Sequence, residues 1–217
     1  MTFEVFHFRN DLKNVFVSPE IRSRFVRMDP GEVSVRHSHD LGHEIFLVLD
    51  GQAEFEIEER RRVLTEGQLC IAEVGEKHSI TCMGEKPMIM YLSVTPHVEP
   101  THTRWTDDGQ KLQPSYGPST RQDRLTHDPT ASNSAEQLGN SLCSTIKDLV
   151  GQVDNTLTTI NKHTSNTLRY ADQRNRESTK ELLDEMWVSM FSMLRQVRKI
   201  ELAWNEFSAR IDESLEE

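Results

Sequence analysis

Histidine and glutamate side chains gather in one short segment, Val-Arg-His-Ser-His-Asp-Leu-Gly-His-Glu, which ends at Glu44. His37 and His39 lie two residues apart, so on a strand their side chains point to the same face. Glu44 begins the next apolar run, where it shares one face with Phe46 and Val48. Two imidazoles and a carboxylate that meet in this way supply three ligands for a divalent metal.

A fourth candidate ligand, His78, lies further along the chain. If the residues after it form a strand, His78, Ile80 and Cys82 point to one side. His78 can therefore join the other three when two hairpins face each other across a barrel. His43 directly precedes Glu44 and points the opposite way along the strand, so we expect it at the rim of the site.

Residues 1–96 have the pattern of an all-β domain. Short apolar runs recur at close spacing and are separated by turn-forming residues, which is typical of a sandwich or barrel. Asp50-Gly51 between two such runs predicts a β-hairpin. The clearest strands are expected at Glu44–Leu49, Ala53–Ile57, Gln68–Ala72 and Met88–Val94.

The spacing of these residues resembles the first conserved motif of the cupin superfamily. All five fixed positions of that motif are matched, by Gly31, His37, His39, Glu44 and Gly51. The resemblance extends over roughly residues 25–96 and implies a single, small antiparallel jelly-roll barrel.

The second cupin motif is matched in part, at Gly67, Gly75 and His78. Glu73 stands where the family usually has proline, and Cys82 stands where it usually has asparagine. These departures alter a turn and an interior wall, so they bear on the fit of a substrate more than on metal binding.

The resemblance implies that the barrel interior binds one divalent metal ion. Its ligands would be His37, His39, Glu44 and His78, and iron, manganese, zinc, nickel and copper all occur in such sites. The residues expected to line the pocket around it are His43, Phe46, Val48, Phe55, Ile57, Ile80, Cys82 and Met90.

Four protein ligands leave one or two positions of an octahedral metal open. A substrate oxygen or O2 could bind there, so one hypothesis is a metal-dependent enzyme such as a dioxygenase, isomerase or cyclase acting on a small organic molecule. Glu73, Glu54 and His43 are candidates for a general base. The other hypothesis is a non-catalytic sensing or scaffold protein, because a fold alone does not determine a reaction. The sequence leaves both open.

Residues 97–133 differ in character from the segment before them. Five prolines lie in this stretch or at its edge, among many threonine, aspartate, arginine and glutamine residues. We interpret it as an irregular connector that wraps the barrel surface, with Trp105 and Tyr116 as anchors. His97, His102 and His127 lack the spacing of metal ligands, so we expect them at the surface.

Residues 134–217 have the pattern of helix, without proline and with apolar residues at spacings of four, four and three. An eleven-residue repeat of this kind favours a straight or slightly right-handed coiled coil. The repeat passes through Leu138, Leu149, Ile160, Ala171, Leu182, Met193, Trp204 and Leu215.

Two arrangements of this helical region remain open. One is a single unbroken helix, about 120 Å long. The other is a helical hairpin that turns in the polar segment Asp172–Ser178, where Ser178 and Glu181 fit a capping box. In either arrangement the apolar stripe needs a partner helix, so we expect a homo-oligomer assembled through this region.

Composition limits the partners and the compartment. The formal net charge is −10, and acidic residues outnumber basic ones in both the barrel and the helical region, which argues against nucleic acid. No apolar run is long enough to predict a membrane helix, and the N-terminus does not resemble a secretory signal. Three cysteines without a CxxC pair favour the cytoplasm over a disulfide framework.

Overall fold

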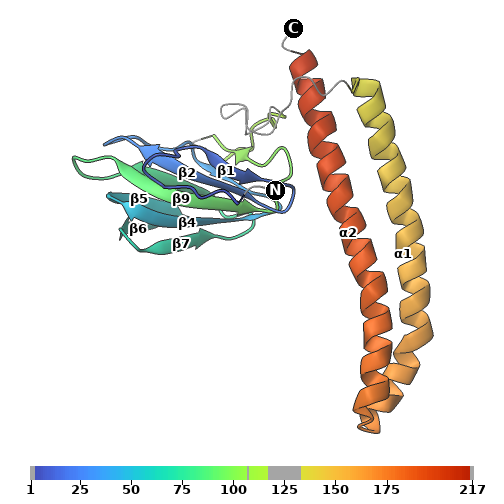
Figure 1. Ribbon diagram of the computed structural model, residues 1–217. Helices are drawn as coiled ribbons and strands as arrows, with labels where there is room; N and C mark the ends of the chain where they lie inside the picture. The colour runs from blue at the N-terminus through green and yellow to red at the C-terminus, as the bar shows by residue number, and fades with distance from the viewer. Residues whose placement is uncertain (1–2, 107, 117–132, 216–217) are drawn as a thin grey trace. The chain divides into compact units, whose positions relative to one another are not determined.

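Among the residues that the structure describes, ten short strands form two facing sheets, and two long helices follow them (Figure 1). The computed structural model describes residues 3–106, 108–116 and 133–215. They divide into two compact units, one made of the described residues up to 116 together with 208–215, and the other of residues 133–207. The strands are β1 (Asn14–Val17), β2 (Arg22–Met28), β3 (His37–Ser38), β4 (His43–Asp50), β5 (Gln52–Ile57), β6 (Arg60–Thr65), β7 (Leu69–Ala72), β8 (His78–Cys82), β9 (Met88–Thr95) and β10 (Thr103–Arg104).

The two sheets have the jelly-roll character that the sequence predicts. One has the order β1-β2-β9-β4-β7 and the other β10-β3-β8-β5-β6, and all neighbouring strands are antiparallel. The four clearest expected strands are present as β4, β5, β7 and β9. Along β4 every second side chain is buried, which places Glu44, Phe46 and Val48 on the inner face. The predicted fold class, a β-barrel followed by long helices, is confirmed.

Apolar side chains fill the space between the sheets. Phe46 and Phe55, one from each sheet, have ring centres 5.3 Å apart and are almost fully buried. Burying a side chain of this size stabilises the fold by about 1.5–3 kcal/mol relative to leaving it exposed. Among the described residues, the buried core cluster includes Met28, Phe46, Val48, Ala53, Phe55, Leu64, Ala72, Ile80, Cys82, Met88, Met90 and Leu92.

The turn between β4 and β5 is the hairpin that Asp50-Gly51 predicts. Gly51 has a φ of 76°, in the left-handed region that glycine adopts without strain. A Cβ added at this position would lie 2.8 Å from the carbonyl oxygen of Pro87 and 3.0 Å from Cα of Met88. The turn therefore requires glycine both for its backbone conformation and for the close approach of the chain entering β9.

The connector returns to the barrel after β9. β10 pairs with β3, with Thr103 opposite Ser38, so the second sheet continues beyond residue 96. Trp105 is an anchor, as expected, because its indole Nε1 donates to Oγ of Ser38 at 3.1 Å and the Lys77 ammonium lies 3.8 Å from its ring centre. Residues 117–132, which include His127, lie outside the described residues.

The C-terminal region contains two helices, α1 (Ala135–Asp172) and α2 (Arg176–Ser214), so the single unbroken helix is wrong. Arg174 has a φ of 54°, a left-handed conformation that a right-handed helix cannot continue through. Asn175 then caps α2, since its side-chain oxygen accepts from the backbone N–H of Ser178 at 3.2 Å. The cap therefore lies three residues before the capping box expected at Ser178. Within the described residues, no helix is both long and apolar enough to cross a membrane.

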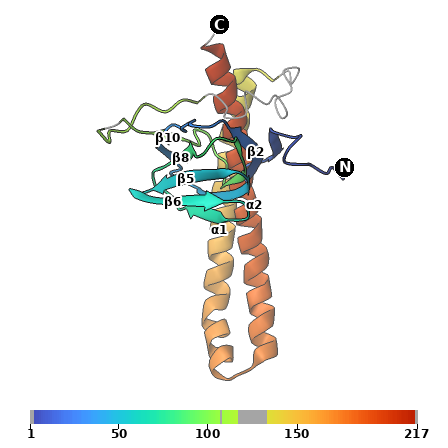
Figure 2. The same ribbon diagram turned by 90° about the vertical axis from the view of Figure 1, so that its left-hand side faces the viewer.

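α1 and α2 lie side by side as an antiparallel hairpin (Figures 1 and 2). Oγ1 of Thr156 donates to the carbonyl of Ser189 at 3.2 Å, and Nε2 of Gln196 donates to the carbonyl of Thr145 at 3.2 Å. We call the buried or half-buried residues that follow alternating spacings of four and three the seam. They are Leu138, Leu142, Thr145, Leu149, Gln152, Thr156, Thr159 and His163 of α1, and Leu182, Met186, Ser189, Met193, Gln196, Ile200, Ala203 and Phe207 of α2.

The seam corrects the predicted eleven-residue repeat. Its spacings add up to seven residues, the period of paired helices that pack knobs into holes. Some members of the eleven-residue series lie in the seam, as Leu149 and Met193 do, and others lie outside it, as Ile160 and Trp204 do. The eleven-residue stripe is therefore not the packing repeat of this hairpin.

We expect Gly51→Ala to lower the free energy of unfolding more than Gly67→Ala does. Both glycines have a positive φ, so both substitutions introduce backbone strain, but nothing lies within 4 Å of a Cβ added at Gly67. Only Gly51→Ala also forces the backbone at Pro87 to move, at a further cost of about 1–3 kcal/mol. Denaturant unfolding of the two full-length variants measures this difference, and equal losses would contradict it.

Candidate metal centre

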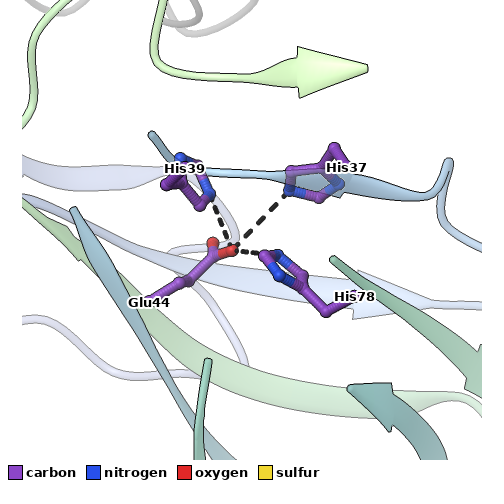
Figure 3. Close-up of side chains that lie close together, drawn as sticks. All are labelled: His37, His39, Glu44 and His78. Atoms are coloured by element: carbon purple, nitrogen blue, oxygen red, sulfur yellow. Dashed lines mark hydrogen bonds and ion pairs between the residues drawn. The ribbon is translucent and has the colours of Figure 1, made fainter. Parts of the chain in front are cut away.

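Glu44 and three histidines meet between the two sheets (Figure 3). Glu44 comes from β4 in one sheet, whereas His37 and His78 lie opposite each other on β3 and β8 of the other sheet, and His39 directly follows β3. Nε2 of His39 and Nε2 of His78 each lie 2.9 Å from Oε2 of Glu44, and Nε2 of His37 lies 3.7 Å from it. The structure thus brings together the four residues that the sequence indicates as metal ligands.

The other ring nitrogen of each histidine, Nδ1, contacts a backbone carbonyl. Because a carbonyl oxygen only accepts, Nδ1 must carry the hydrogen, and in a neutral imidazole Nε2 then presents its lone pair. Three Nε2 lone pairs therefore converge on the Glu44 carboxylate. The pairs that set this orientation are His37 with Val35 (2.8 Å), His78 with Glu76 (2.9 Å) and His39 with Thr101.

This donor set fits a divalent metal ion. A lone pair and a carboxylate oxygen are both acceptors, so a proton or a cation must lie between them. Nε2 of His37 is buried and has no hydrogen-bond partner among the described residues. The four ligand atoms lie within 4.8 Å of one another, which suits metal bonds of about 2.0–2.2 Å to nitrogen and oxygen. Imidazole and carboxylate ligands do not distinguish iron, manganese, zinc, nickel and copper.

The charge of Glu44 is the central electrostatic feature of the site. Burial alone raises the pKa of this carboxyl, but hydrogen bonds from the three imidazoles, made when a proton lies between Nε2 and the carboxylate, outweigh burial and hold the pKa well below its usual range. Glu44 is 3% exposed, so its negative charge is compensated by its neighbours and not by water. A carboxylate of this kind is ready to bind a cation without first losing a proton.

Two histidines that the sequence places at the surface are packed near the cluster, so that prediction is wrong. The ring centre of His102 lies 4.7 Å from that of His37 and 5.0 Å from that of His39, and His97 is 3% exposed. The cause is the pairing of β10 with β3, which carries the preceding residues back across the barrel. The contact between His102 and His37 depends on the pairing of β10 with β3, each only two residues long. Spacing in the sequence therefore could not predict it.

Burial keeps both of these histidines uncharged. It lowers the pKa of His102 to about 2, with the nearby His37 and His39 acting in the same direction. It lowers the pKa of His97 to about 4, although the Glu99 carboxylate acts in the opposite direction. A neutral imidazole beside the cluster can donate or accept one hydrogen bond without adding charge.

The residues expected to line a pocket occupy three different environments. His43 is exposed and points away from Glu44 on β4. Phe55 and Ile57 border a cavity between the sheets. The remaining five, each 4% exposed or less, are packed in the core: Phe46, Val48, Ile80, Cys82 and Met90.

The general-base candidates of the sequence do not reach the four ligands. Glu73 is exposed beyond β7, and Glu54 lies on the outer face of β5, where its carboxylate is 3.8 Å from the Arg61 guanidinium. His43 faces the same side as the outer residues of β4. His102 is therefore the additional titratable side chain beside the cluster that the sequence did not indicate.

Two cavities lie near the cluster, and one of its four residues lines the first of them. One, of about 210 Å³, is lined by His39 and by connector residues that include Thr101 and Lys111. The other, of about 300 Å³, has apolar walls that include Phe55 and Ile57, and Ile57 is the register partner of His78. Arg60, Arg62 and Glu76 also line this second cavity.

Two facing antiparallel sheets with a buried three-histidine, one-glutamate cluster define a jelly-roll protein with a candidate metal centre. Residues 24–95 match the family model described as the Cupin domain, and they form a cupin domain that precedes the helical region. The match spans less than half of the chain. Among curated proteins, none matches it.

Several solved structures resemble the barrel. A conserved protein with a double-stranded β-helix domain from Klebsiella pneumoniae is 21% identical, with 44% of this chain and 91% of that one covered and a TM-score of 0.42. KdgF from Halomonas sp. is 25% identical, with 41% and 79% covered and a TM-score of 0.37. An oxalate oxidase in complex with glycolate is 21% identical, with 36% and 42% covered and a TM-score of 0.34.

We expect the metal-free protein to lose stability as the pH falls below 6.5. In the unfolded chain His97 and His102 take up protons near their ordinary pKa of 6.5, whereas in the folded chain their pKa values are about 4 and about 2. Between these values the unfolded state binds more protons, so the free energy of unfolding decreases with falling pH. Urea unfolding of chelator-treated protein measures this decrease. His102→Phe should make it shallower, and an unchanged slope would contradict the prediction.

Proposed function

We propose that the barrel binds one divalent metal ion through His37, His39, Glu44 and His78 and acts on a small organic molecule, with oxygenase or isomerase chemistry. The observation that supports this most directly is the convergence of three Nε2 lone pairs on one buried carboxylate. When bound, a metal at this position polarises a substrate oxygen or activates O2. The three cysteines are free thiols, which supports a reducing compartment such as the cytoplasm.

The substrate is proposed to lie on the His37 side of the cluster. The His37 side chain is 16% exposed, whereas those of the other three ligands are 2–3% exposed. His102 packs against His37 on this side, and its uncharged ring can hydrogen-bond to a bound molecule. We therefore assign His102 a role in positioning the substrate.

A second candidate function is ligand sensing or scaffolding without turnover. It is favoured by the helical hairpin, whose helices of 38 and 39 residues exceed what a single-barrel enzyme requires. A sensing barrel would bind metal and ligand and change its assembly, but it would not consume substrate. Turnover measurements therefore separate the two functions.

We expect the purified full-length protein to bind one metal ion per chain when iron, manganese, nickel or zinc is supplied. His37→Ala/His39→Ala removes two of the four ligands and should abolish stoichiometric binding, whereas His43→Ala, which changes an exposed neighbour, should bind as the wild type does. Elemental analysis after gel filtration measures the stoichiometry. A wild-type protein that retains none of these metals would disprove the metal centre and the proposed chemistry with it.

His102→Phe is expected to weaken substrate use without loss of metal. The substitution keeps an uncharged ring beside His37 but removes its hydrogen bond, which corresponds to a reduction of roughly tenfold in kcat/KM. O2 consumption, together with detection of isomerised products by NMR, over a panel of organic acids, diketones and phenols would identify a substrate first. Unchanged kinetics in a metal-loaded variant would place the substrate elsewhere, and the absence of turnover with any compound would favour sensing.

A further inference from the structure

The seam of the helical hairpin contains polar as well as apolar residues, and further apolar residues lie outside it. Thr156 and Ser189 share a hydrogen-bonded pair within the seam, and Nε2 of His163 lies 3.0 Å from a carboxylate oxygen of Glu185. In contrast, Leu157 is 57% exposed and Trp187 is 58% exposed. Long helices derive most of their stability from packing apolar faces, and this distribution leaves a second apolar surface without a partner in the hairpin itself.

The outer apolar residues of the two helices lie on the same side of the hairpin. In both helices, several residues four positions after a seam residue are apolar and lie outside the seam, as at Val153 after Leu149 and Met190 after Met186. Two antiparallel helices are related by a local two-fold axis that is normal to the plane containing both helices. Rotation about this axis exchanges the helices, so residues at the same position relative to the seam lie on the same side of that plane in both helices. We call this set the side face: Ile146, Val150, Val153, Leu157 and Ile160 of α1, and Leu183, Trp187, Met190, Leu194 and Val197 of α2.

The opposite side of the hairpin is polar at the equivalent positions. The residues directly before the seam residues Leu149, Thr156, Met193 and Ile200 are Asp148, Asn155, Ser192 and Lys199. Val188 and Leu202, which directly precede the seam residues Ser189 and Ala203, are apolar exceptions on this side, and Phe191 and Leu168 are further exposed apolar residues outside the side face. The hairpin therefore presents one mainly apolar side and one mainly polar side, as a half of a four-helix bundle does.

The α1 and α2 residues of the side face lie next to each other along the hairpin. This follows from two contacts across the seam, between Thr145 and Gln196 and between Thr156 and Ser189. The face is thus two helices wide and apolar along a continuous length. A second copy of the same face, turned by a two-fold rotation, would cover it with apolar residues at every level.

The area of the side face is that of a stable dimer interface. Its seven most exposed members are each 42–59% exposed, which for side chains of this size amounts to roughly 600 Å², near the ~800 Å² that each partner contributes to a standard interface. Monomeric proteins rarely leave a contiguous apolar patch of this size in water. We propose that two copies of this chain pair through their side faces and form an antiparallel four-helix bundle.

Paired substitutions on the full-length chain test this proposal. Leu157→Glu/Trp187→Glu places four buried charges in the bundle and should weaken dimerisation by roughly a hundredfold or more. Asn155→Glu/Ser192→Glu adds the same charges on the polar side and should leave the mass unchanged. Sedimentation equilibrium measures the masses, and far-UV circular dichroism at equal concentration checks that both variants keep their helices.

Trp187 provides a readout that association through the barrel would not affect. The difference in fluorescence between the wild type and Trp187→Phe reports on this indole, and it should shift to shorter wavelength as the concentration rises through the dimer range. A side-face variant with the wild-type mass, or an indole that stays solvent-exposed in the dimer, would overturn the proposal. A wild-type monomer at all concentrations would also overturn it and would assign the side face to another part of this chain or to a different protein.

Discussion

The compensation of one buried negative charge constrains the barrel more than any other interaction. A carboxylate that is 3% exposed would be strongly destabilising alone, and Glu44 is tolerated because the three imidazoles around it can share a proton or a cation with it. Glu44 belongs to one sheet and the histidines belong to the other, so this compensation exists only when the two sheets face each other in the correct register. Folding and assembly of the candidate metal centre are therefore the same event, and a cation would strengthen the contact that joins the layers.

Much of the site could be predicted because it depends on short-range geometry. The two-residue period of a strand directs Glu44, Phe46 and Val48 inward, and the left-handed Gly51 sets the turn that follows. His102 could not be predicted in this way, since its position depends on the pairing of two strands of two residues each. The pocket-lining residues were predicted as inward-facing, but periodicity cannot tell a side chain that lines a cavity from one that is packed in the core.

The helical region shows a different limit of sequence reasoning. Apolar spacing identified helix correctly, but the eleven-residue series combined residues from the seam with residues from the side face. The break between the helices depends on Arg174 in a left-handed conformation and on the cap formed by Asn175, both of which are local details within a polar segment. Hydrophobic periodicity shows which positions of a helix are apolar. It does not show which of them pack in the seam, because hydrogen bonds between polar seam residues also determine which faces of α1 and α2 meet.

The hydrogen bond from His39 differs from those of the other two histidine ligands in its origin. His37 and His78 are oriented by carbonyls two residues away, whereas His39 is oriented by Thr101, a residue of the connector. Occupation of the metal centre and ordering of the connector are therefore thermodynamically linked, because each favours the same state of the His39 ring. By reciprocity, a force or partner that displaces residues near Thr101 would lower the affinity of the centre for its ion without contacting any ligand.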